Sequence, residues 1–386
     1  MKIVVLDANA YWTEQLFSAC SRFADVLLLK PRDFRAHHRL HGKWTSDRFP
    51  IQRGAHVWEQ RFSMLPGWMF SFWSISSKVI ADAVKRFAGN EETVLVFTYP
   101  QYRSMLSIVQ PELSIYYNLD NYADNWPRHA KVLSQWEEET VRRVDATVCI
   151  AQYRQQFLQR RVPEKAQKIS HLPLGTTPDF MANSRLQHTQ TVPDALKAIA
   201  HPRVGYIGAL NRRFDYAFLV EVAQIQPEVQ FILGGSVPTS RDGDPKWSAG
   251  FLQAKNLANV HFIGWVDHLE LGGWLNAFDA LFMCYSQCRF NMNASPAKLW
   301  DYLGTGLPII ASENNPETLL WRDFIYLGST PSAFAAHISK ALTENDPSSR
   351  KRRLDIAAAH TWDALAQRFQ ALVSESLRPQ FAPTTA

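Results

Sequence analysis

The segment Asn291–Ile310, NMNASPAKLWDYLGTGLPII, combines residue types that are suited to binding a phosphorylated ligand. Ser295 and Pro296 are typical of an N-cap and a first helical position, so we expect a helix to begin directly after them. Lys298 then lies in the first turn, where a cation opposes the helix dipole unless an anion binds there. Asp301 lies on the same face and is suited to accepting hydrogen bonds from ribose or sugar hydroxyls. The alternative is an ordinary Lys–Asp surface pair.

A second segment with possible ligand chemistry is Val204–Asp215, VGYIGALNRRFD. It predicts a strand, a turn with Gly205 and Gly208, and then a helix. Glycine allows the backbone to approach a ligand closely, and a helix N-terminus favours anions. Arg212 and Arg213 are placed to neutralise a diphosphate through charge-assisted hydrogen bonds. The alternative is a tight connection followed by two solvated arginines.

Asp120 is the candidate for a general base. It directly follows the apolar segment at residues 114–117, so we expect it at the carboxyl end of a strand. A carboxylate at that place can take the proton of an attacking hydroxyl, and burial among neighbouring tyrosines would raise its pKa into a useful range. The alternative is that Asp120 is an N-cap for the next helix. Asp124 is the nearby substitute.

Short β-branched segments alternate with longer amphipathic segments along the chain, which predicts an α/β fold with parallel sheets. In the first half we expect strands at residues 3–6, 26–29, 94–98, 114–117 and 146–150. In the second half we expect them at residues 204–207, 229–233, 260–263, 280–284, 308–311 and 324–327.

The chain has 386 residues, more than one hydrophobic core usually supports, so we expect two domains. We place them at residues 1–178 and 179–360, followed by a C-terminal helix and loose tail at 361–386. Glycine, proline and polar residues between positions 171 and 192 predict a hinge. Two α/β domains joined in this way predict a ligand-binding cleft at the carboxyl ends of their strands.

The composition is that of an ordinary globular protein, with 46% hydrophobic and 20% charged residues and a net charge of +5. The four cysteines are scattered, so we expect free thiols in a reducing compartment. Two histidines four apart, His37 and His41, lack further ligands, and a solvated basic loop is the favoured interpretation over a metal site. No signal peptide or spanning helix is predicted.

The aromatic stretch Trp58–Trp73, WEQRFSMLPGWMFSFW, is flanked by basic residues. We favour its packing into a core, with contact to a membrane or a lipid-linked acceptor as the alternative. We expect no nucleic-acid partner, because no aromatic–basic motif of the known modules is present.

Several of these segments resemble GT-B glycosyltransferases of the group 1/family 4-like superfamily, which act in bacterial polysaccharide biosynthesis. The similar segments are YYNLDNY at 116–122, HLPLGTTPDF at 171–180, GYIGAL at 205–210, NVHFIGWVDHLELGGWLNAFDALFMCYS at 259–286 and SPAKLWDYLGTGLPIIAS at 295–312. The resemblance implies two Rossmann-like domains with parallel sheets facing a cleft. It also implies that the N-terminal domain binds the acceptor and the C-terminal domain binds the nucleotide sugar.

By this resemblance Gly208 approaches the donor phosphates, Arg212 or Arg213 contacts the diphosphate, and Lys298 faces phosphate or the transferred sugar. Asp301 holds the ribose hydroxyls, and a similar aspartate occupies the place of Asp120 in related inverting enzymes. Many retaining members carry two glutamates eight residues apart, where this chain has Asn293 and Asp301. The stereochemistry therefore stays open, with Asn293 kept among the donor-binding candidates.

The function so implied is transfer of a hexosyl or uronosyl residue from a nucleotide sugar, UDP-linked by default, to a glycan or lipid-linked acceptor in cell-surface polysaccharide synthesis. We expect no metal requirement, because arginine and lysine serve the phosphates. A cytoplasmic location is expected, with the inner face of the plasma membrane as an extension. The alternatives are a sugar-nucleotide epimerase on the same fold and a non-catalytic nucleotide-sugar or polysaccharide-binding partner protein.

Overall fold

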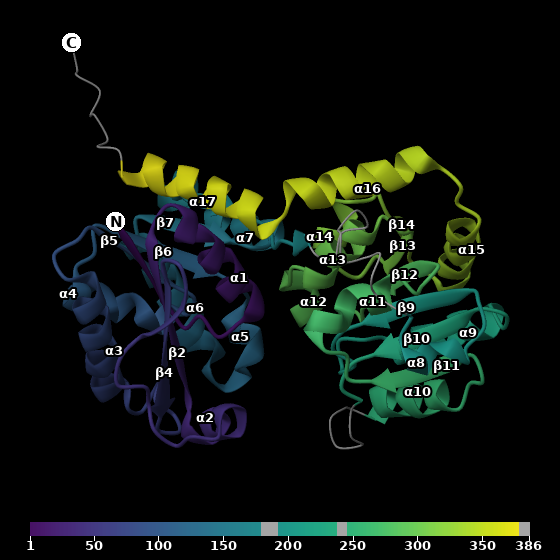
Figure 1. Cartoon of the computed structure of the whole chain (residues 1–386), viewed down its shortest axis with the longest axis horizontal. Coiled ribbons are helices and arrows are strands. Elements are labelled where there is room, and N and C mark those ends of the chain that lie inside the picture. Colours follow the sequence, from purple (N-terminus) through teal and green to yellow (C-terminus); the bar gives the residue numbers. More distant parts are fainter. Residues whose placement is uncertain (179–191, 238–244, 378–386) are drawn as a thin grey trace, which may run out of the picture. The chain divides into compact units, whose positions relative to one another are not determined.

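The computed structural model describes residues 1–178, 192–237 and 245–377, and these divide into two compact units (Figure 1). Unit 1 comprises Met1–Pro173 together with helix α17, Trp362–Leu377, and unit 2 comprises Leu174–Thr361. Residues 179–191 of the predicted hinge and residues 378–386 of the predicted tail lie outside the described residues.

Unit 1 is built on an 8-stranded sheet in the order β3-β4-β2-β1-β5-β6-β7-β8. All neighbours are parallel except β3 and β4. The strands are β1 Lys2–Leu6, β2 Asp25–Asp33, β3 Ile51–Gly54, β4 Val57–Met64, β5 Thr93–Phe97, β6 Leu113–Asn118, β7 Ala146–Cys149 and β8 Ile169–His171. The α-helices are α1 Tyr11–Ala19, α2 Phe34–His41, α3 Trp73–Ala88, α4 Leu106–Val109, α5 Tyr122–Asn125, α6 Ala130–Arg143 and α7 Gln152–Arg161.

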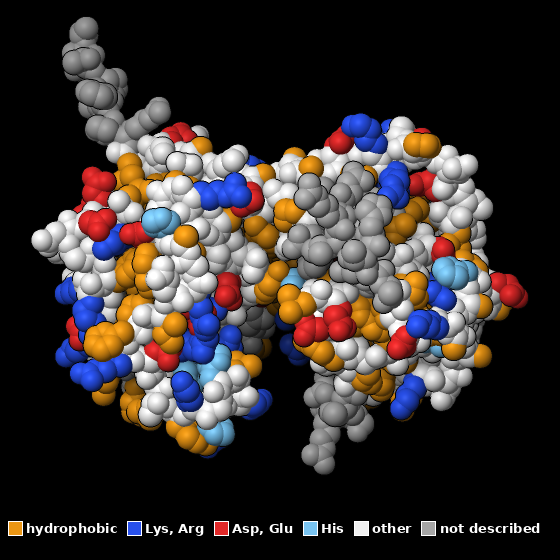
Figure 2. Space-filling model, in the orientation of Figure 1, with side chains coloured by type: hydrophobic (Ala, Val, Ile, Leu, Met, Phe, Trp, Pro, Cys, Tyr) orange, Lys and Arg blue, Asp and Glu red, His pale blue; other side chains and the backbone are white. Residues whose placement is uncertain are grey.

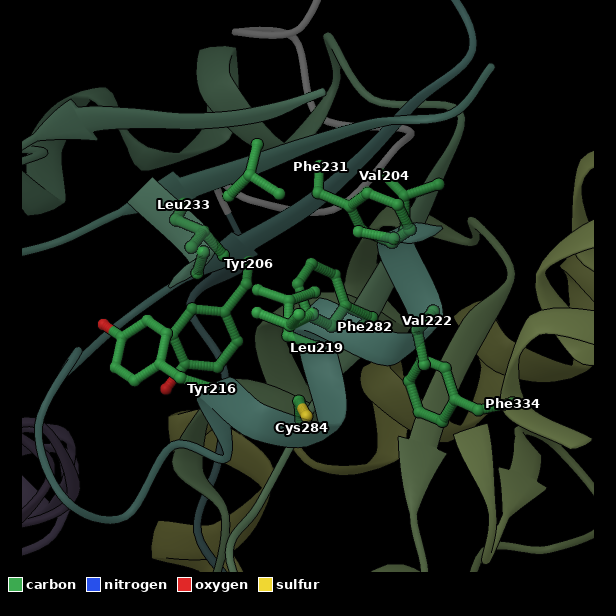
Figure 3. Packing of buried hydrophobic residues seen from close by; sticks show 14 of the residues in the cluster. Val204, Tyr206, Tyr216, Leu219, Val222, Phe231, Leu233, Phe282, Cys284 and Phe334 are labelled. Atoms are coloured by element: carbon green, nitrogen blue, oxygen red, sulfur yellow. The ribbon is translucent and has the colours of Figure 1, made fainter. Parts of the chain in front are cut away.

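Unit 2 is built on a 6-stranded parallel sheet in the order β11-β10-β9-β12-β13-β14. Its strands are β9 Arg203–Ile207, β10 Gln230–Gly234, β11 Val260–Gly264, β12 Ala280–Met283, β13 Ile309–Ser312 and β14 Tyr326–Gly328. Its α-helices are α8 Asp194–Lys197, α9 Tyr216–Ile225, α10 Pro245–Lys255, α11 Leu271–Leu275, α12 Arg289–Asn293, α13 Ala297–Thr305, α14 Pro316–Leu319, α15 Pro331–Leu342 and α16 Pro347–Ala359. Figure 3 shows the core of this unit, where Leu219 and Val222 of α9 pack with Phe231 and Phe282 from the sheet. The predicted α/β fold with parallel sheets is confirmed.

The strands form where the sequence concentrates β-branched and aliphatic residues, because a parallel sheet is covered on both faces. In β1, Ile3–Leu6 are all buried. Strand β4 was not predicted, since its sequence VWEQRFSM is polar at several positions. It is nevertheless buried at Glu59, which forms an ion pair with Lys30, and at Gln60, whose Nε2 donates to the Asp47 carbonyl.

Two places in the sheets are topological switch points, where successive connections leave in opposite directions. In unit 1, β1 lies between β2 and β5, and in unit 2, β9 lies between β10 and β12. In open α/β sheets, ligands bind beyond the carboxyl ends of the strands at such points. Ligand-binding groups are therefore expected in the turns after β1 and β9.

Helix α17 (yellow in Figure 1) packs on unit 1 although it follows unit 2 in the sequence. The rings of Phe369 and Phe17 of α1 meet edge to face with centroids 5.2 Å apart. Arg22 and Asp363 form an ion pair of 2.6 Å beside this contact.

Candidate functional site

Two glycine turns meet at the switch point of unit 2. The Gly208 N–H donates to the Gly234 carbonyl over 2.9 Å. A Cβ on Gly235 would lie 2.0 Å from the Gly208 oxygen, so no side chain fits there. Gly205, in contrast, is required by core packing, because its Cβ would lie 2.2 Å from the Phe278 ring. Gly208 and Gly235 thus allow the two turns to approach each other, whereas Gly205 allows Phe278 to pack in the core.

Lys298 approaches the Gly208 turn from helix α13. A Cβ on Gly208 would lie 2.7 Å from its Cε and 3.2 Å from its Nζ. The ammonium lies 5.0 Å from the centroid of the Tyr206 ring and donates to the Tyr285 hydroxyl over 3.4 Å. Burial lowers the pKa of Lys298 to about 8, and nearby Arg213 adds to this shift. Among the described residues, none forms an ion pair with Lys298. A half-buried cation in such surroundings is arranged to receive an anion.

The helix start after Ser295 and Pro296 is confirmed, because α13 begins at Ala297. The predicted cap is wrong: Pro296 is itself the N-cap, in an extended conformation, and no side chain caps the helix. The backbone N–H groups in the first turn of α13, which also contains Lys298, therefore donate no hydrogen bond to a capping side chain. Tyr302 anchors the helix to the sheet, since its hydroxyl accepts from the Ile207 N–H over 2.9 Å at the end of β9.

The two arginines of the Val204–Asp215 segment differ in their surroundings. The Arg213 guanidinium is half-buried and lies 3.2 Å from the centroid of the Phe290 ring. The Arg213 carbonyl accepts from Asn291 Nδ2 over 2.9 Å, which joins this loop to α12. Arg212 has an exposed side chain, and its carbonyl accepts from Ser286 Oγ over 2.9 Å. The structure therefore brings Arg213 and Lys298 together, while the side chain of Arg212 is directed to solvent.

Asp301 also lies on α13, but it has its own partner. Thr176 Oγ1 donates to Asp301 Oδ1 over 2.8 Å. Burial raises the pKa of Asp301 to about 7, against the lowering effects of Thr176 and Lys298. Because both side chains are half-buried and Asp301 is held by Thr176, the alternative of an exposed Lys298–Asp301 surface pair is wrong.

Asn293 ends α12 and is buried, with 9% of its surface exposed. Its Nδ2 donates to the Arg289 carbonyl over 2.8 Å. Asn315, a residue that sequence reasoning missed, donates to the Ala294 carbonyl over 2.9 Å. Tyr206, Tyr285 and Phe290 were also missed, because an aromatic residue near a strand end does not differ in sequence from core packing.

Asp120 follows β6 in unit 1, as predicted, and is half-buried. Its Oδ1 accepts from the Asn121 N–H over 2.8 Å, and its Oδ2 accepts from Asn125 Nδ2 over 3.0 Å. The N-cap of α5 is Asn121, so the alternative role of Asp120 as the N-cap is wrong. Asp124 lies in the same loop, and its Oδ2 accepts from Asn121 Nδ2 over 2.8 Å.

A buried ion pair underlies the Asp120 loop. Arg154 of α7 is 1% exposed, and its Nη2 donates to both carboxylate oxygens of Glu137 of α6 over 2.7 Å. Asn118 Nδ2 donates to Glu137 Oε1 over 2.9 Å and to the Asp120 carbonyl over 3.1 Å. The pair thus supports the backbone of the candidate base. Sequence reasoning missed it, because Glu137 and Arg154 lie on separate helices.

The histidines of α2 do not form a metal centre with other described residues. His37 and His41 lie on α2 with ring centroids 5.0 Å apart, and His38 stacks on Trp44 at 3.8 Å. The interpretation of this segment as a solvated loop is wrong, since His37 is 1% exposed on a helix. Within the described ranges, no group of His, Cys, Asp and Glu is arranged to hold a metal ion. All four cysteines are free thiols.

No family model matches the sequence. TuaH of Bacillus subtilis strain 168, provisionally named as a teichuronic acid biosynthesis glycosyltransferase, is 21% identical over 301 residues, which are 75% of this chain and 74% of TuaH. Anabaena HepE, in a crystal structure with UDP and glucose, has a TM-score of 0.71 at 14% identity, with 97% of this chain and 100% of HepE covered.

A UDP-forming α,α-trehalose-phosphate synthase from Burkholderia xenovorans has a TM-score of 0.68 at 10% identity, with 98% of this chain and 99% of that chain covered. The likeness to solved structures shows that the fold is the GT-B fold. Together with the TuaH relative, these findings confirm the class predicted from the sequence, a glycosyltransferase with two Rossmann-like sheets.

Proposed function

We propose that this protein transfers a hexosyl or uronosyl residue from a UDP-sugar to a glycan or lipid-linked acceptor in cell-surface polysaccharide synthesis. The observation that carries the proposal is the position of Lys298 against the Gly208 turn of unit 2, with Arg213 near enough to lower its pKa. Arg213 lowers the pKa of Lys298, and an anion bound beside Lys298 would stabilise its charged form. HepE binds UDP and glucose, and TuaH is named for teichuronic acid biosynthesis, which supports the donor and the pathway.

In this proposal the diphosphate binds between the Gly208 turn and the uncapped first turn of α13. The backbone N–H groups and the helix dipole add to the attraction by the cations. Arg213 and Lys298 then stabilise the negative charge that develops on the leaving nucleotide diphosphate. Asp301 accepts a hydrogen bond from ribose hydroxyls, Asn293 lies beside the transferred sugar, and Arg212 contributes from the exposed rim.

Asp120 of unit 1 is the proposed general base of an inverting transfer. Its carboxylate takes the proton of the acceptor hydroxyl while that oxygen bonds to the anomeric carbon. The bond between the anomeric carbon and the phosphate oxygen breaks, and its electron pair leaves with UDP. Because the cations of unit 2 stabilise the leaving group, the proposed mechanism requires no metal ion.

A thermal-shift screen of the purified protein against UDP, GDP, dTDP, ADP and their sugars tests the donor site. Ligand at 100 times its Kd adds about 2.7 kcal/mol to the free energy of unfolding, which is readily detected. We expect a selective shift with UDP and UDP-sugars that disappears in Lys298→Ala. The Lys340→Ala variant, which removes an exposed cation of α15, is the matched control and keeps the shift. No shift with any nucleotide contradicts the proposal.

The affinity for UDP should fall as the pH rises above about 8. In the free protein Lys298 has a pKa of about 8, and a bound diphosphate favours its charged form. Above this pH, binding must therefore take up a proton, and affinity falls by up to about tenfold per pH unit. Isothermal titration in buffers of different ionisation enthalpy measures this uptake. A wild-type affinity that is constant up to about pH 9.5, or a fall that persists in Lys298→Ala, excludes Lys298 as the responsible group.

The cytoplasmic location and the membrane contact belong to the same proposal. No described helix is long and apolar enough to span a membrane. In the aromatic stretch, Phe62, Met64 and Trp68 are buried, whereas Leu65 and Phe72 are 56% and 40% exposed.

Phe72 at the start of α3 and Ile75 and Val79 on the helix form a row of exposed hydrophobic side chains. Lys78, also exposed, is next to Val79 in the sequence. On the visible face of unit 1, hydrophobic side chains adjoin Lys and Arg side chains (Figure 2). This combination suits contact with an anionic bilayer surface. Cosedimentation with vesicles of anionic lipid should decrease in Ile75→Ser, and equal cosedimentation of this variant contradicts the contact.

A further inference from the structure

Asp7 occupies the switch point of unit 1 but was not among the candidates from sequence. It follows β1 directly, and β1 lies between β2 and β5, whose connections leave in opposite directions. The Asp7 backbone has φ of 64°, in the left-handed region that side chains rarely adopt. Its side chain is buried, with 5% exposed. Strained backbone of this kind persists where the surrounding structure holds it, and it concentrates at functional sites.

The carboxyl group of Asp7 is held by neighbouring side chains. Asn9 Nδ2 donates to its Oδ1, and the Tyr102 hydroxyl donates to its Oδ2 over 3.5 Å. Asn9 is itself fixed, because its Nδ2 also donates to the Pro31 carbonyl over 2.8 Å. The backbone carbonyl of Asn9 accepts from Arg32 Nη2 over 3.2 Å. Burial raises the pKa of Asp7 to about 7, against the lowering effects of Asn9, Arg32 and Tyr102. The group is thus oriented by the protein while retaining a free lone pair.

Polar atoms without a hydrogen-bond partner lie beside Asp7. Asn9 Oδ1 and the Tyr122 hydroxyl are both buried, and neither has a partner among the described residues. The Tyr122 and Tyr99 rings are 4.3 Å apart. Burial raises the pKa of both hydroxyls, and the charges of Asp7 and Asp120 add to the shift of Tyr99. For Tyr122, the larger additions after burial come from Tyr99 and Tyr116. Tyr99 follows β5 and Tyr122 follows β6, and these strands end at the same edge of the sheet as β1, which precedes Asp7. Buried polar groups are normally paired, so partners supplied by a ligand explain the unpaired atoms.

We propose that Asp7, Asn9 and Tyr122 bind hydroxyl groups of an uncharged sugar ring in the acceptor. A sugar hydroxyl both donates and accepts a hydrogen bond, which matches the acceptor atoms of Asp7 and Asn9 and the donor hydroxyl of Tyr122. The nearby carboxylates of Asp7 and Asp120 disfavour a uronic acid at this position. Asp7 binds and orients the acceptor, and no bond is made or broken at its carboxyl group. This inference rests on the proposed function.

Ligand-observed NMR in the presence of saturating UDP tests the proposal with four defined probes. The probes are the methyl glycosides of glucose, galactose, N-acetylglucosamine and glucuronic acid. We expect at least one of the three uncharged glycosides to bind the wild type, with the glucuronide weaker than each that binds. Asp7→Asn and Asp7→Gly should both weaken this binding by about tenfold or more, since each removes a hydrogen bond to a charged or ionisable group.

The two variants keep the backbone intact, because asparagine tolerates the left-handed region and glycine adopts it without strain. Unchanged far-UV circular dichroism and urea unfolding of both variants show that unit 1 is folded, and Asp82→Asn on the exposed face of α3 is the matched control. The inference is overturned if UDP binds but no uncharged glycoside does, if the glucuronide binds best, or if both Asp7 variants bind as the wild type does. Failure of UDP to bind the wild type contradicts the proposed function instead.

Discussion

Replacing Asp120 by asparagine is expected to lower turnover by about 10²-fold or more and to leave the affinity for UDP unchanged. The amide keeps the size of the side chain, and its oxygen can still accept from the Asn121 N–H. Its NH2 group can donate to the Asn125 side-chain oxygen once that amide rotates, so the loop is preserved. It cannot take the proton of the acceptor hydroxyl at neutral pH. UDP affinity is unaffected because Arg213 and Lys298, the residues proposed to bind the diphosphate, belong to unit 2.

Asp124→Asn is the matched control for this prediction, since it removes a carboxylate of the same loop. The measurement is the release of UDP in the presence of acceptor, together with a UDP titration of each variant. Near-wild-type turnover in Asp120→Asn would assign the base to another group. If Asp124→Asn instead loses about 10²-fold in turnover, Asp124 takes that role.

Removing Arg154 should destabilise unit 1 by about 3–5 kcal/mol, the usual cost of leaving one member of a buried ion pair unpaired. In Arg154→Met the carboxylate of Glu137 keeps its hydrogen bonds from Tyr116 and Asn118 but loses the guanidinium that neutralises it. Urea unfolding followed by circular dichroism measures the change. We expect the unfolding transition of unit 1 to occur at a lower urea concentration in the variant than in the wild type.

The double variant Arg154→Met with Glu137→Gln separates the pair from the packing of the arginine. It should recover a large part of the loss, because no buried charge then lacks a partner. A single variant within about 1 kcal/mol of the wild type would show that the pair adds little to stability. A double variant no more stable than the single one would assign the loss to packing.

The order of elements was largely predictable from the sequence, because strands of parallel sheets are short aliphatic runs separated by amphipathic helices. The segment at residues 3–6 was placed within one residue of β1, and the helix after Pro296 was placed at its true start. Strand β4 was missed for the opposite reason. Its Glu59 is neutralised by Arg61 of the same strand and by Lys30 and Arg53 of the neighbouring strands β2 and β3. The pairing of these strands could not be predicted from the segment alone.

The candidate site was predictable residue by residue but not as an arrangement. Gly208, Arg213, Lys298 and Asp301 were each identified from local chemistry. Their partners were not: Thr176 reaches Asp301 across 125 residues of sequence, and Tyr206 and Tyr285 meet Lys298 from two strand ends.

The sequence by itself determined the class of fold and the chemical character of the segments proposed to bind phosphate, since periodicity, glycine turns and helix starts are local properties. Tertiary structure alone decided which groups converge. The strand order places β1 and β9 at switch points, which makes Asp7 a candidate and brings Lys298 to Gly208. It also seats helix α17 on unit 1 and pairs Glu137 with Arg154. These contacts depend on the neighbours of each strand and helix in space, and local patterns of residues carry no information about those neighbours.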